Sequence, residues 1–356
     1  MFKINPQSFG LDISDKFLRI IKLGKKGDNL ILKSFGKTKV PAGIIEKGEV
    51  KNPEKLAIII KQALKEIKGE KIKTRYVTLS LPEEKSFLDV LKIPILEEKE
   101  TEETIKFEIE NYIPLEIEEV YFDFQKVKPE KDQKKYQEIL IAAVPKKIVG
   151  PYLESLNQAK LKPLALEVEC LSTVRSLIKK NAKIDPLLII DLGEEKTSFI
   201  IFSRGSIRFT STIPISSQTL TTAISKNLEV TIKKAELLKS KEGLIGKRKI
   251  FDAMIPCLTD LTEQIKDHLM YYKSHNVELK ELKKSKRLEK ILICGSGAKL
   301  KGLVSFLSSN LKIEVEVGNP WVNILEDKVK EVPNLPFKKS LGYTTALGLA
   351  LKEYYD

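Results

Sequence analysis

The sequence has few of the residues on which disulfide frameworks, metal centres and histidine catalysis depend. It contains three cysteines and two histidines among 356 residues. Because Cys170, Cys257 and Cys294 are odd in number and widely spaced, the sequence excludes a disulfide framework and a Cys-x-x-Cys metal site. With only His268 and His275, a Ser-His-Asp or Cys-His arrangement has little support, and two surface histidines are favoured over a metal site. The cysteine usage is typical of a reducing compartment, so we expect a cytoplasmic protein.

Long apolar runs are also absent. No stretch approaches the roughly 18 residues of a membrane-spanning helix, and no charged-then-apolar signal sequence opens the chain. We therefore expect a protein that is not secreted through a standard signal and does not itself cross a membrane.

The charge is strongly basic but dispersed. Lys and Arg outnumber Asp and Glu by 62 to 49, which gives a net charge of +13. The densest basic stretches, 226–249 and 273–301, lack the interleaved aromatic residues of a single-strand-binding surface, and no zinc finger, basic zipper or RNP-like motif is present. The sequence therefore argues against nucleic-acid binding. Residues 97–119 have the opposite sign, with ten Glu and two Lys, and mark a distinct surface.

Length and composition indicate a globular protein of about two domains. Hydrophobic residues make up 42% of the chain and charged residues 31%, a balance typical of soluble folds. Within the chain, residues 83–160 read as strand, helix, strand, strand, helix, which predicts a compact α+β insertion. Helical patterns dominate 217–288.

An internal repeat is the clearest signal. In the first copy, an apolar strand ends in Asp12, the chain turns through residues 14–16, and a second apolar strand follows. In the second copy, the strand LLII ends in Asp191 and residues 193–196 form the turn. The two aspartates lie 179 positions apart, half the chain length. This repeat predicts two similar α/β halves that face each other across a cleft.

Such hairpins suit a nucleotide polyphosphate. Backbone N–H groups of a tight turn hold an anion, and a neighbouring Asp binds Mg²⁺, usually through water. A third element, strand 291–294 followed by Gly295, Ser296 and Gly297, lets the backbone approach a flat base because glycine has no Cβ. This segment matches neither the Rossmann fingerprint nor a Walker loop. Each element alone is common, so the order of the three carries the prediction.

These residues resemble the motifs of the actin-like ATPase superfamily. Phosphate-1 matches 10–19 (GLDISDKFLR), phosphate-2 matches 190–198 (IDLGEEKTS), and the adenosine motif matches 292–303 (LICGSGAKLKGL). Within the superfamily the chain is most similar to the PilM family of type IV pilus assembly proteins, relatives of the cell-division protein FtsA. The stretches that carry this closer match are 107–124 (FEIENYIPLEIEEVYFDF), 166–177, 205–216, 235–239 (AELLK) and 341–355.

The resemblance implies a duplicated α/β fold of the actin-like (ribonuclease H-like) type. It would have two domains, a nucleotide cleft between them and an inserted α+β subdomain of the FtsA type. The expected ranges are 1–82 for the first-domain core (completed by 161–182 and 338–356), 83–160 for the inserted subdomain, 183–225 and 290–337 for the second-domain core, and 226–289 for its helical subdomain.

The resemblance also implies ATP and Mg²⁺ as ligands. Asp12 and Asp191 would be the carboxylates on the Mg²⁺ side, and Glu169, with Glu167, would lie near the attacking water. The residues expected to contact the nucleotide are Asp12, Ser14, Asp15, Lys16, Asp191, Gly193, Glu194, Lys196, Thr197, Glu236, Lys239, Gly295, Ser296, Gly297 and Lys299.

Several positions depart from the family pattern. Ser14 stands where the family usually has Gly, Asp15 where it has a small residue, and Glu194 where it has Gly, Ala or Ser. Ser216 and Ser217 replace a common pair of glycines. An added carboxylate opposes polyphosphate binding unless it points away or helps to hold the metal. The sequence leaves open whether ATP is only bound or is also hydrolysed by a weak ATPase, and whether the site has become purely structural.

For function, the resemblance implies a scaffold of a type IV pilus or type II secretion-like assembly. It would capture the cytoplasmic N-terminal tail of a PilN-like bitopic membrane protein, in a groove between the first domain and the inserted subdomain. The protein would thus be recruited to the cytoplasmic face of the inner membrane only through its partner, alongside other platform components, and self-association is left open. The expected groove residues are Tyr112, Ile113, Pro114, Leu115, Tyr121 and Phe122.

Two alternatives stay open. A metabolite kinase of the same superfamily would need a general base beside the acceptor hydroxyl, and no Asp stands in a context that recommends it. An FtsA-like cell-division filament protein would carry an amphipathic C-terminal membrane helix, which this sequence lacks, so we favour pilus assembly.

Overall fold

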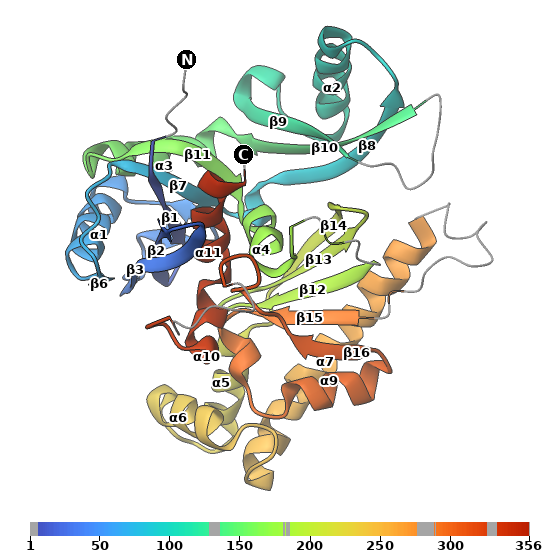
Figure 1. The fold of residues 1–356 in the computed structure, drawn as a ribbon. Coiled ribbons are helices and arrows are strands. Elements are labelled where there is room, and N and C mark those ends of the chain that lie inside the picture. The colour runs from blue at the N-terminus through green and yellow to red at the C-terminus, as the bar shows by residue number, and fades with distance from the viewer. Residues whose placement is uncertain are drawn as a thin grey trace. The chain divides into compact units, whose positions relative to one another are not determined.

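The computed structural model describes residues 6–127, 136–180, 182, 186–275, 288, 290–325 and 333–355. The chain forms two compact units (Figure 1). Unit 1 comprises Met1–Ala182, Arg204–Arg208 and Asn319–Asp356, and unit 2 comprises Lys183–Ser203 and Phe209–Gly318.

Unit 1 is built on a six-stranded mixed sheet with the order β11-β7-β1-β2-β3-β6. β1 pairs antiparallel with β2 and parallel with β7, and β7 pairs parallel with β11. A separate two-stranded ribbon is formed by β4 and β5. The strands of these two sheets are β1 (Ser8–Ile13), β2 (Phe17–Lys26), β3 (Asn29–Lys39), β4 (Ile45–Glu46), β5 (Glu49–Val50), β6 (Lys68–Gly69), β7 (Tyr76–Leu81) and β11 (Lys162–Val168).

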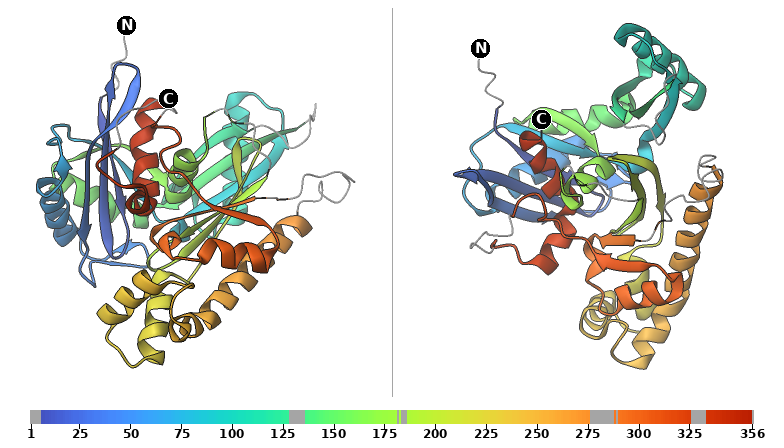
Figure 2. Two further views of the ribbon diagram at one scale, coloured as in Figure 1. Left: turned by 60° about the horizontal axis from the view of Figure 1, so that its bottom comes forward. Right: turned by 45° about the vertical axis from the view of Figure 1, so that its right-hand side comes forward.

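Helices cover the sheet of unit 1. α1 (Pro53–Lys65) begins where the Asn52 side chain accepts a hydrogen bond from the Lys55 amide at 2.9 Å. α11 (Thr344–Leu351) is entirely buried and contacts both β1 and α4 (Glu169–Leu177) (Figure 2). The short helix α10 (Phe337–Ser340) and the 3₁₀ turns η4 (Leu341–Tyr343) and η5 (Lys352–Tyr354) flank α11.

Two glycines allow α11 to pack this closely. A Cβ on Gly10 of β1 would overlap the carbonyl oxygen of Ala346, and a Cβ on Gly348 would overlap that of Ser172 in α4. Because backbone atoms occupy both spaces, neither position has room for a larger residue.

Residues 83–160 have the strand, helix, strand, strand, helix order that their pattern predicts. The elements are η1 (Glu83–Lys85), β8 (Phe87–Pro94), α2 (Glu98–Tyr112), η2 (Ile117–Glu119), β9 (Val120–Val127), β10 (Tyr136–Pro145) and α3 (Lys146–Gln158). The antiparallel sheet β8-β10-β9 has α2 over one face (Figure 1). Ile105 and Ile109 of α2 pack against Ile139 and Ile141 of β10, so the acidic residues of α2 lie on the outside.

Unit 2 repeats the strand arrangement of unit 1. Its sheet has the order β14-β13-β12-β15-β16. β12 pairs antiparallel with β13 and parallel with β15, which pairs parallel with β16. β1 has the same relation to β2, β7 and β11, so the duplication predicted from the two Asp-containing hairpins is present in the fold. The strands are β12 (Leu187–Leu192), β13 (Thr197–Ser203), β14 (Ser206–Ile213), β15 (Lys290–Cys294) and β16 (Glu314–Val317).

The region predicted to be dominated by helices, 217–288, contains α5 (Ser217–Asn227), α6 (Ile232–Glu242) and α7 (Arg248–His275). α6 ends at Gly243, whose φ of 62° closes the helix. Part of the stretch expected to be helical, 276–287, lies outside the described residues. η3 (Ser296–Lys299) and α9 (Leu303–Leu311) complete the unit.

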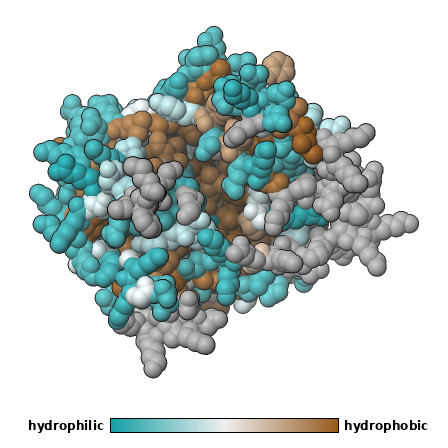
Figure 3. Space-filling model, turned by 45° about the horizontal axis from the view of Figure 1, so that its top comes forward, coloured by the Kyte–Doolittle hydropathy of each residue, from teal (hydrophilic) through white to brown (hydrophobic). Residues whose placement is uncertain are grey.

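On the face drawn in Figure 3, hydrophilic residues surround the apolar residues and are not confined to one side of that face. No helix in the described part of the chain is both long enough and apolar enough to cross a membrane.

Gly348→Ala should destabilise unit 1, because the new methyl group would meet the Ser172 backbone. We expect a loss of about 1–3 kcal/mol or more in the free energy of unfolding, measured with urea. Gly150→Ala in α3 is the matched control: no heavy atom lies within 4 Å of the added Cβ. The control should be neutral or stabilising by up to about 1 kcal/mol. Equal effects of the two changes would contradict the close packing of α11.

Candidate functional site

The first hairpin holds a buried carboxylate. Asp12 lies one residue before the end of β1, and its Oδ2 is 3.3 Å from the Arg19 guanidinium on the paired strand β2. Its Oδ1 accepts a hydrogen bond from the Ser80 hydroxyl of β7 at 3.2 Å. The carboxylate is therefore held at the end of β1 by both neighbouring strands.

The turn after Asp12 is closed by Ser14. Its backbone N–H and its hydroxyl both donate to the Phe17 carbonyl, at 2.9 and 3.0 Å. The carbonyl of Lys16 accepts from the Val40 amide at 2.8 Å. Serine in place of the family's usual glycine thus has a local role, since its side chain completes the turn.

Asp15 is turned toward another part of unit 1. Its Oδ2 accepts from the Lys47 amide at 2.6 Å and its Oδ1 from the Gly48 amide at 2.9 Å. Both residues form the tight turn between β4 and β5. The sequence left open which way the Asp15 carboxylate points. In the structure it accepts hydrogen bonds from two backbone amides.

The second hairpin in unit 2 has the same form. Asp191 lies one residue before the end of β12. The Gly193 amide donates to the Lys196 carbonyl at 2.9 Å, and a Cβ on Gly193 would come within 2.7 Å of that oxygen. Thr197 begins β13 and donates its hydroxyl to the Ile215 carbonyl at 2.6 Å.

The N-terminus of α5 packs directly on this second turn. The amides of Ser217 and Gln218 donate to the carbonyls of Gly193 and Glu194, at 3.0 and 3.1 Å. The positive end of a helix dipole thus lies beside the turn that is expected to hold phosphate, which favours an anion there.

The Gly-rich turn lies against the end of β12. Gly295 has a φ of 83°, and a Cβ on it would overlap the Asp191 carboxylate, while a Cβ on Gly297 would overlap the Leu192 side chain. Contacts inside the protein therefore explain why both positions need glycine. Sequence reasoning had instead attributed these glycines to the close approach of a base. The contacts also bring the second hairpin and the adenosine motif together within unit 2.

Ser296 is the unusual residue of this turn. Its hydroxyl oxygen is buried and has no hydrogen-bond partner among the described residues. An unsatisfied buried hydroxyl costs about 1–3 kcal/mol, so the turn has an unused polar atom that a ligand could satisfy. Lys299, three residues on, is exposed.

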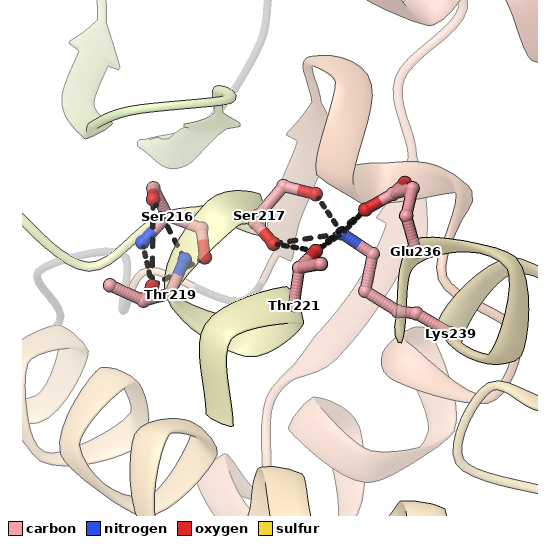
Figure 4. Close-up of polar contacts among 6 residues, drawn as sticks. All are labelled: Ser216, Ser217, Thr219, Thr221, Glu236 and Lys239. Atoms are coloured by element: carbon pink, nitrogen blue, oxygen red, sulfur yellow. Dashed lines mark hydrogen bonds and ion pairs between the residues drawn. The ribbon is translucent and has the colours of Figure 1, made fainter. Parts of the chain in front are cut away.

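Glu236 and Lys239 form the centre of a polar cluster between α5 and α6 (Figure 4). The buried ammonium of Lys239 is 2.9 Å from the Glu236 carboxylate. It also donates to the carbonyl and hydroxyl of Ser217, both at 2.8 Å, and to the Thr221 hydroxyl at 2.6 Å. Thr221 in turn donates to Glu236 at 2.6 Å.

Burial and pairing act in opposite directions on this pair. Burial lowers the pKa of Lys239, although Glu236 opposes the change. For Glu236, burial acts to raise the pKa, but hydrogen bonds from Lys239 and Thr221 outweigh it and leave the pKa lowered. Pairing thus favours the charged forms of both groups, against the effect of burial.

The cluster assigns different roles to its two charged members. The acceptors of the Lys239 ammonium are protein atoms, so this side chain joins α5 to α6. The Glu236 side chain is 55% exposed, so it is the member accessible to a ligand. Sequence reasoning noted Ser217 only as a departure from a family glycine, and it missed Thr221. Ser216 and Thr219 form a capping box at the start of α5 (Figure 4).

Glu167 and Glu169 have separate surroundings. The Glu167 carboxylate receives two hydrogen bonds from Arg175, at 2.7 and 2.6 Å, and lies 3.2 Å from the Lys352 ammonium. Arg175 also donates to the Gly348 carbonyl at 3.0 Å. Glu167 thereby ties β11, α4 and α11 together, which favours a structural role.

Glu169 is the first residue of α4 and lies beside Glu83, a buried acidic residue. Its Oε2 lies 3.5 Å from the Glu83 amide. Burial, with the charges of Glu83 and Glu169, raises the pKa of the Cys170 thiol well above its ordinary value. No sequence motif marked Glu83, which follows β7 in the chain and is placed beside Glu169 only by folding.

The expected groove residues divide between core and surface. Ile113 and Phe122 pack against the core of the inserted subdomain, whereas Tyr121 is 50% exposed with the Lys146 ammonium 5.3 Å from its ring centre. Leu115 is half-buried and Pro114 is exposed. The side chain of Tyr112 lies outside the described residues. Sequence reasoning missed Phe107, which is 65% exposed on α2.

The described residues contain no group of three or more His, Cys, Asp or Glu side chains able to hold a metal ion. A Mg²⁺ ion here would therefore need phosphate oxygens and water as further ligands, which is its usual coordination beside nucleotides. Of the two histidines, His268 contacts the Ser211 hydroxyl at 2.8 Å and the Gln264 carbonyl at 2.7 Å. The side chain of His275 lies outside the described residues.

Comparison with known proteins supports the resemblance seen in the sequence. Residues 10–354 match the family described as type IV pilus assembly protein PilM. A chain of the solved "PilM-PilN type IV pilus biogenesis complex" is 26% identical, with a TM-score of 0.81, and the similarity covers 98% of this chain and 99% of that one.

More distant structures share the fold. EutJ from Carboxydothermus hydrogenoformans is 13% identical with a TM-score of 0.56, over 98% of this chain and 90% of that one. MreB5 of Spiroplasma citri, solved bound to ADP, is 12% identical with a TM-score of 0.54, over 95% and 94%. These likenesses confirm the predicted actin-like fold and, at such identities, nothing beyond it.

Glu167→Gln should reveal a structural role. Removing one charge of a buried ion pair typically costs about 3–5 kcal/mol, so we expect a loss of that order in the free energy of unfolding. Glu46→Gln at an exposed position is the control, with an expected change within about 0.5 kcal/mol. If Glu167→Gln left the free energy of unfolding unchanged and slowed ATP turnover, Glu167 would have a role in ATP hydrolysis and not in stabilising the fold.

Proposed function

Since the chain belongs to the type IV pilus assembly protein PilM family, we propose that it is a nucleotide-binding scaffold of a type IV pilus or type II secretion-like assembly. In this role it binds the cytoplasmic N-terminal tail of a PilN-like membrane protein. That tail holds it at the cytoplasmic face of the inner membrane, next to other platform components.

One observation carries the partner proposal. The similarity to the PilM–PilN complex extends over nearly the whole of both chains, so it includes the inserted subdomain of residues 83–160. That subdomain exposes Phe107 on the acidic helix α2 and Tyr121 on β9. Exposed aromatic side chains of this kind are typical anchors for a partner peptide.

The proposed nucleotide is Mg-ATP, and the residues present fit it. Asp12 of the hairpin in unit 1 and Asp191 of the hairpin in unit 2 would each bind Mg²⁺ through water. The N-terminus of α5 beside the second turn favours phosphate, and the unused hydroxyl of Ser296 supports a ligand at the Gly-rich turn. A bound Mg²⁺ would neutralise part of the phosphate charge.

We assign the roles of Glu236, Lys239 and Glu169 from their exposure and from the partners that they already have. Glu236, the exposed member of its pair, would contact the ribose or base, with Lys239 as its positioning residue. Glu169 would lie on the water side, because Glu167 is already bound by Arg175 and Lys352. The domain ranges expected from the sequence stay part of this proposal, although residues 319–337, expected in the second domain, belong to unit 1.

Asp12→Asn combined with Asp191→Asn should weaken Mg-ATP binding at least tenfold, or about 1.4 kcal/mol, in isothermal titration calorimetry. Asp12→Asn also removes the charge paired with buried Arg19, so the titration is made at a temperature at which circular dichroism shows the double variant folded, and Asp191→Asn alone should weaken binding in the same direction. Asp28→Asn, in the exposed turn between β2 and β3, is the control. Unchanged affinity in the double variant would exclude these carboxylates from the nucleotide site.

Tyr121→Ala should weaken binding of a synthetic peptide that carries the N-terminal cytoplasmic segment of the PilN-like protein from the same genome. Truncating an interface tyrosine typically costs 2 kcal/mol or more, so we expect a Kd at least about tenfold higher by fluorescence anisotropy. Tyr271→Ala on α7, a tyrosine that is also 50% exposed, is the matched control and should leave the Kd unchanged. Equal Kd values for both variants would place the peptide elsewhere.

A further inference from the structure

The turn between β4 and β5 has a conformation that must be stabilised from outside. Its two central residues, Lys47 and Gly48, have φ values of 49° and 75°, so the turn is of the type I′ class. A left-handed φ is unfavourable for lysine. Both central amides point to the Asp15 carboxylate, at 2.6 and 2.9 Å, so Asp15 supplies the two hydrogen bonds that hold the turn.

The other side of this turn faces the rest of unit 1. Gly48 is buried, and a Cβ on it would come within 2.5 Å of Pro82, which follows β7. The Gly48 carbonyl accepts a hydrogen bond from the hydroxyl of Tyr152 at 2.9 Å. Gly48 therefore bonds to Asp15 through its amide and to Tyr152 through its carbonyl.

Tyr152 connects this turn to the inserted subdomain. It lies in α3 and is 1% exposed, which fixes its ring. α3 follows β10 without an intervening residue, since β10 ends at Pro145 and α3 begins at Lys146. β10 is the central strand of the subdomain sheet. A shift of the Tyr152 hydroxyl would therefore act on the strand around which the subdomain is built.

Asp15 is also the acidic residue of the turn that is expected to hold a polyphosphate at the first hairpin. It belongs to the turn of residues 14–16, and its carboxylate carries the same charge as a phosphate. Like charges that lie close together repel each other, and the repulsion is stronger in a partly buried site than in water. Binding at this turn thus alters how strongly Asp15 holds the amides of Lys47 and Gly48.

We propose that Asp15, the turn of Lys47 and Gly48, and Tyr152 couple the first phosphate-binding hairpin to the inserted subdomain. The inference rests on the proposed nucleotide binding and adds its regulation: occupancy of the hairpin changes the state of α3 and β10, and so the affinity of the subdomain for its peptide partner. By linkage, the partner changes nucleotide affinity by the same factor.

Hydrogen exchange of the full chain, with and without Mg-ATP, tests each step. In the unmodified protein, Mg-ATP should change the protection of the Lys47 and Gly48 amides and of residues 146–158 by about fivefold or more, the lower range of coupling between sites. Tyr152→Phe removes only the hydroxyl. Mg-ATP should then still change protection at Lys47 and Gly48 but no longer at 146–158.

Asp15→Asn tests the first step. It removes the charge and leaves one oxygen acceptor for two amides, so Mg-ATP, added at a concentration that calorimetry shows to saturate this variant, should change protection at neither place. Tyr136→Phe, on β10, is the matched control and should behave as the unmodified protein does.

The outcomes separate this coupling from the proposed function. Mg-ATP that binds without changing protection at 146–158, or a change that survives Tyr152→Phe, would overturn the coupling alone. A protein that binds no Mg-ATP by calorimetry would overturn the proposed nucleotide site and this inference with it.

Discussion

A carboxylate buried at the end of a strand must be given hydrogen-bond partners, and the first hairpin is arranged around this requirement for Asp12. Its partners, Arg19 and Ser80, come from the strands on either side of β1, so the charge is stable only when all three strands are in register. The strand order is repeated around Asp191 in unit 2. An aspartate held rigidly in this way is suited to bind a cation through water without rearrangement.

The departures from the family's motifs have physical explanations inside the protein. Asp15, which could have opposed a polyphosphate, is bound to the amides of Lys47 and Gly48. Ser217, in place of a glycine, supplies two of the acceptors for the buried ammonium of Lys239. These side chains stabilise the elements that carry the candidate site, so the departures do not by themselves argue that the site has lost its function.

The predictions that succeeded rest on local patterns. The two hairpins and the insertion order in 83–160 each follow from residues close together in the chain. The contact between the Glu83 amide and the Glu169 carboxylate was missed because 86 positions separate the two residues.

The sequence by itself determined the duplicated hairpins, the inserted subdomain and the family, because strand periodicity, turn residues and motif order are properties of short segments. Only the tertiary structure decided which partner each polar side chain has. Asp15 meets Gly48, and Gly48 meets Tyr152 on α3, across 33 and 104 positions of the chain. Such contacts depend on how the sheet and its helices pack, and no local pattern of residues encodes that packing.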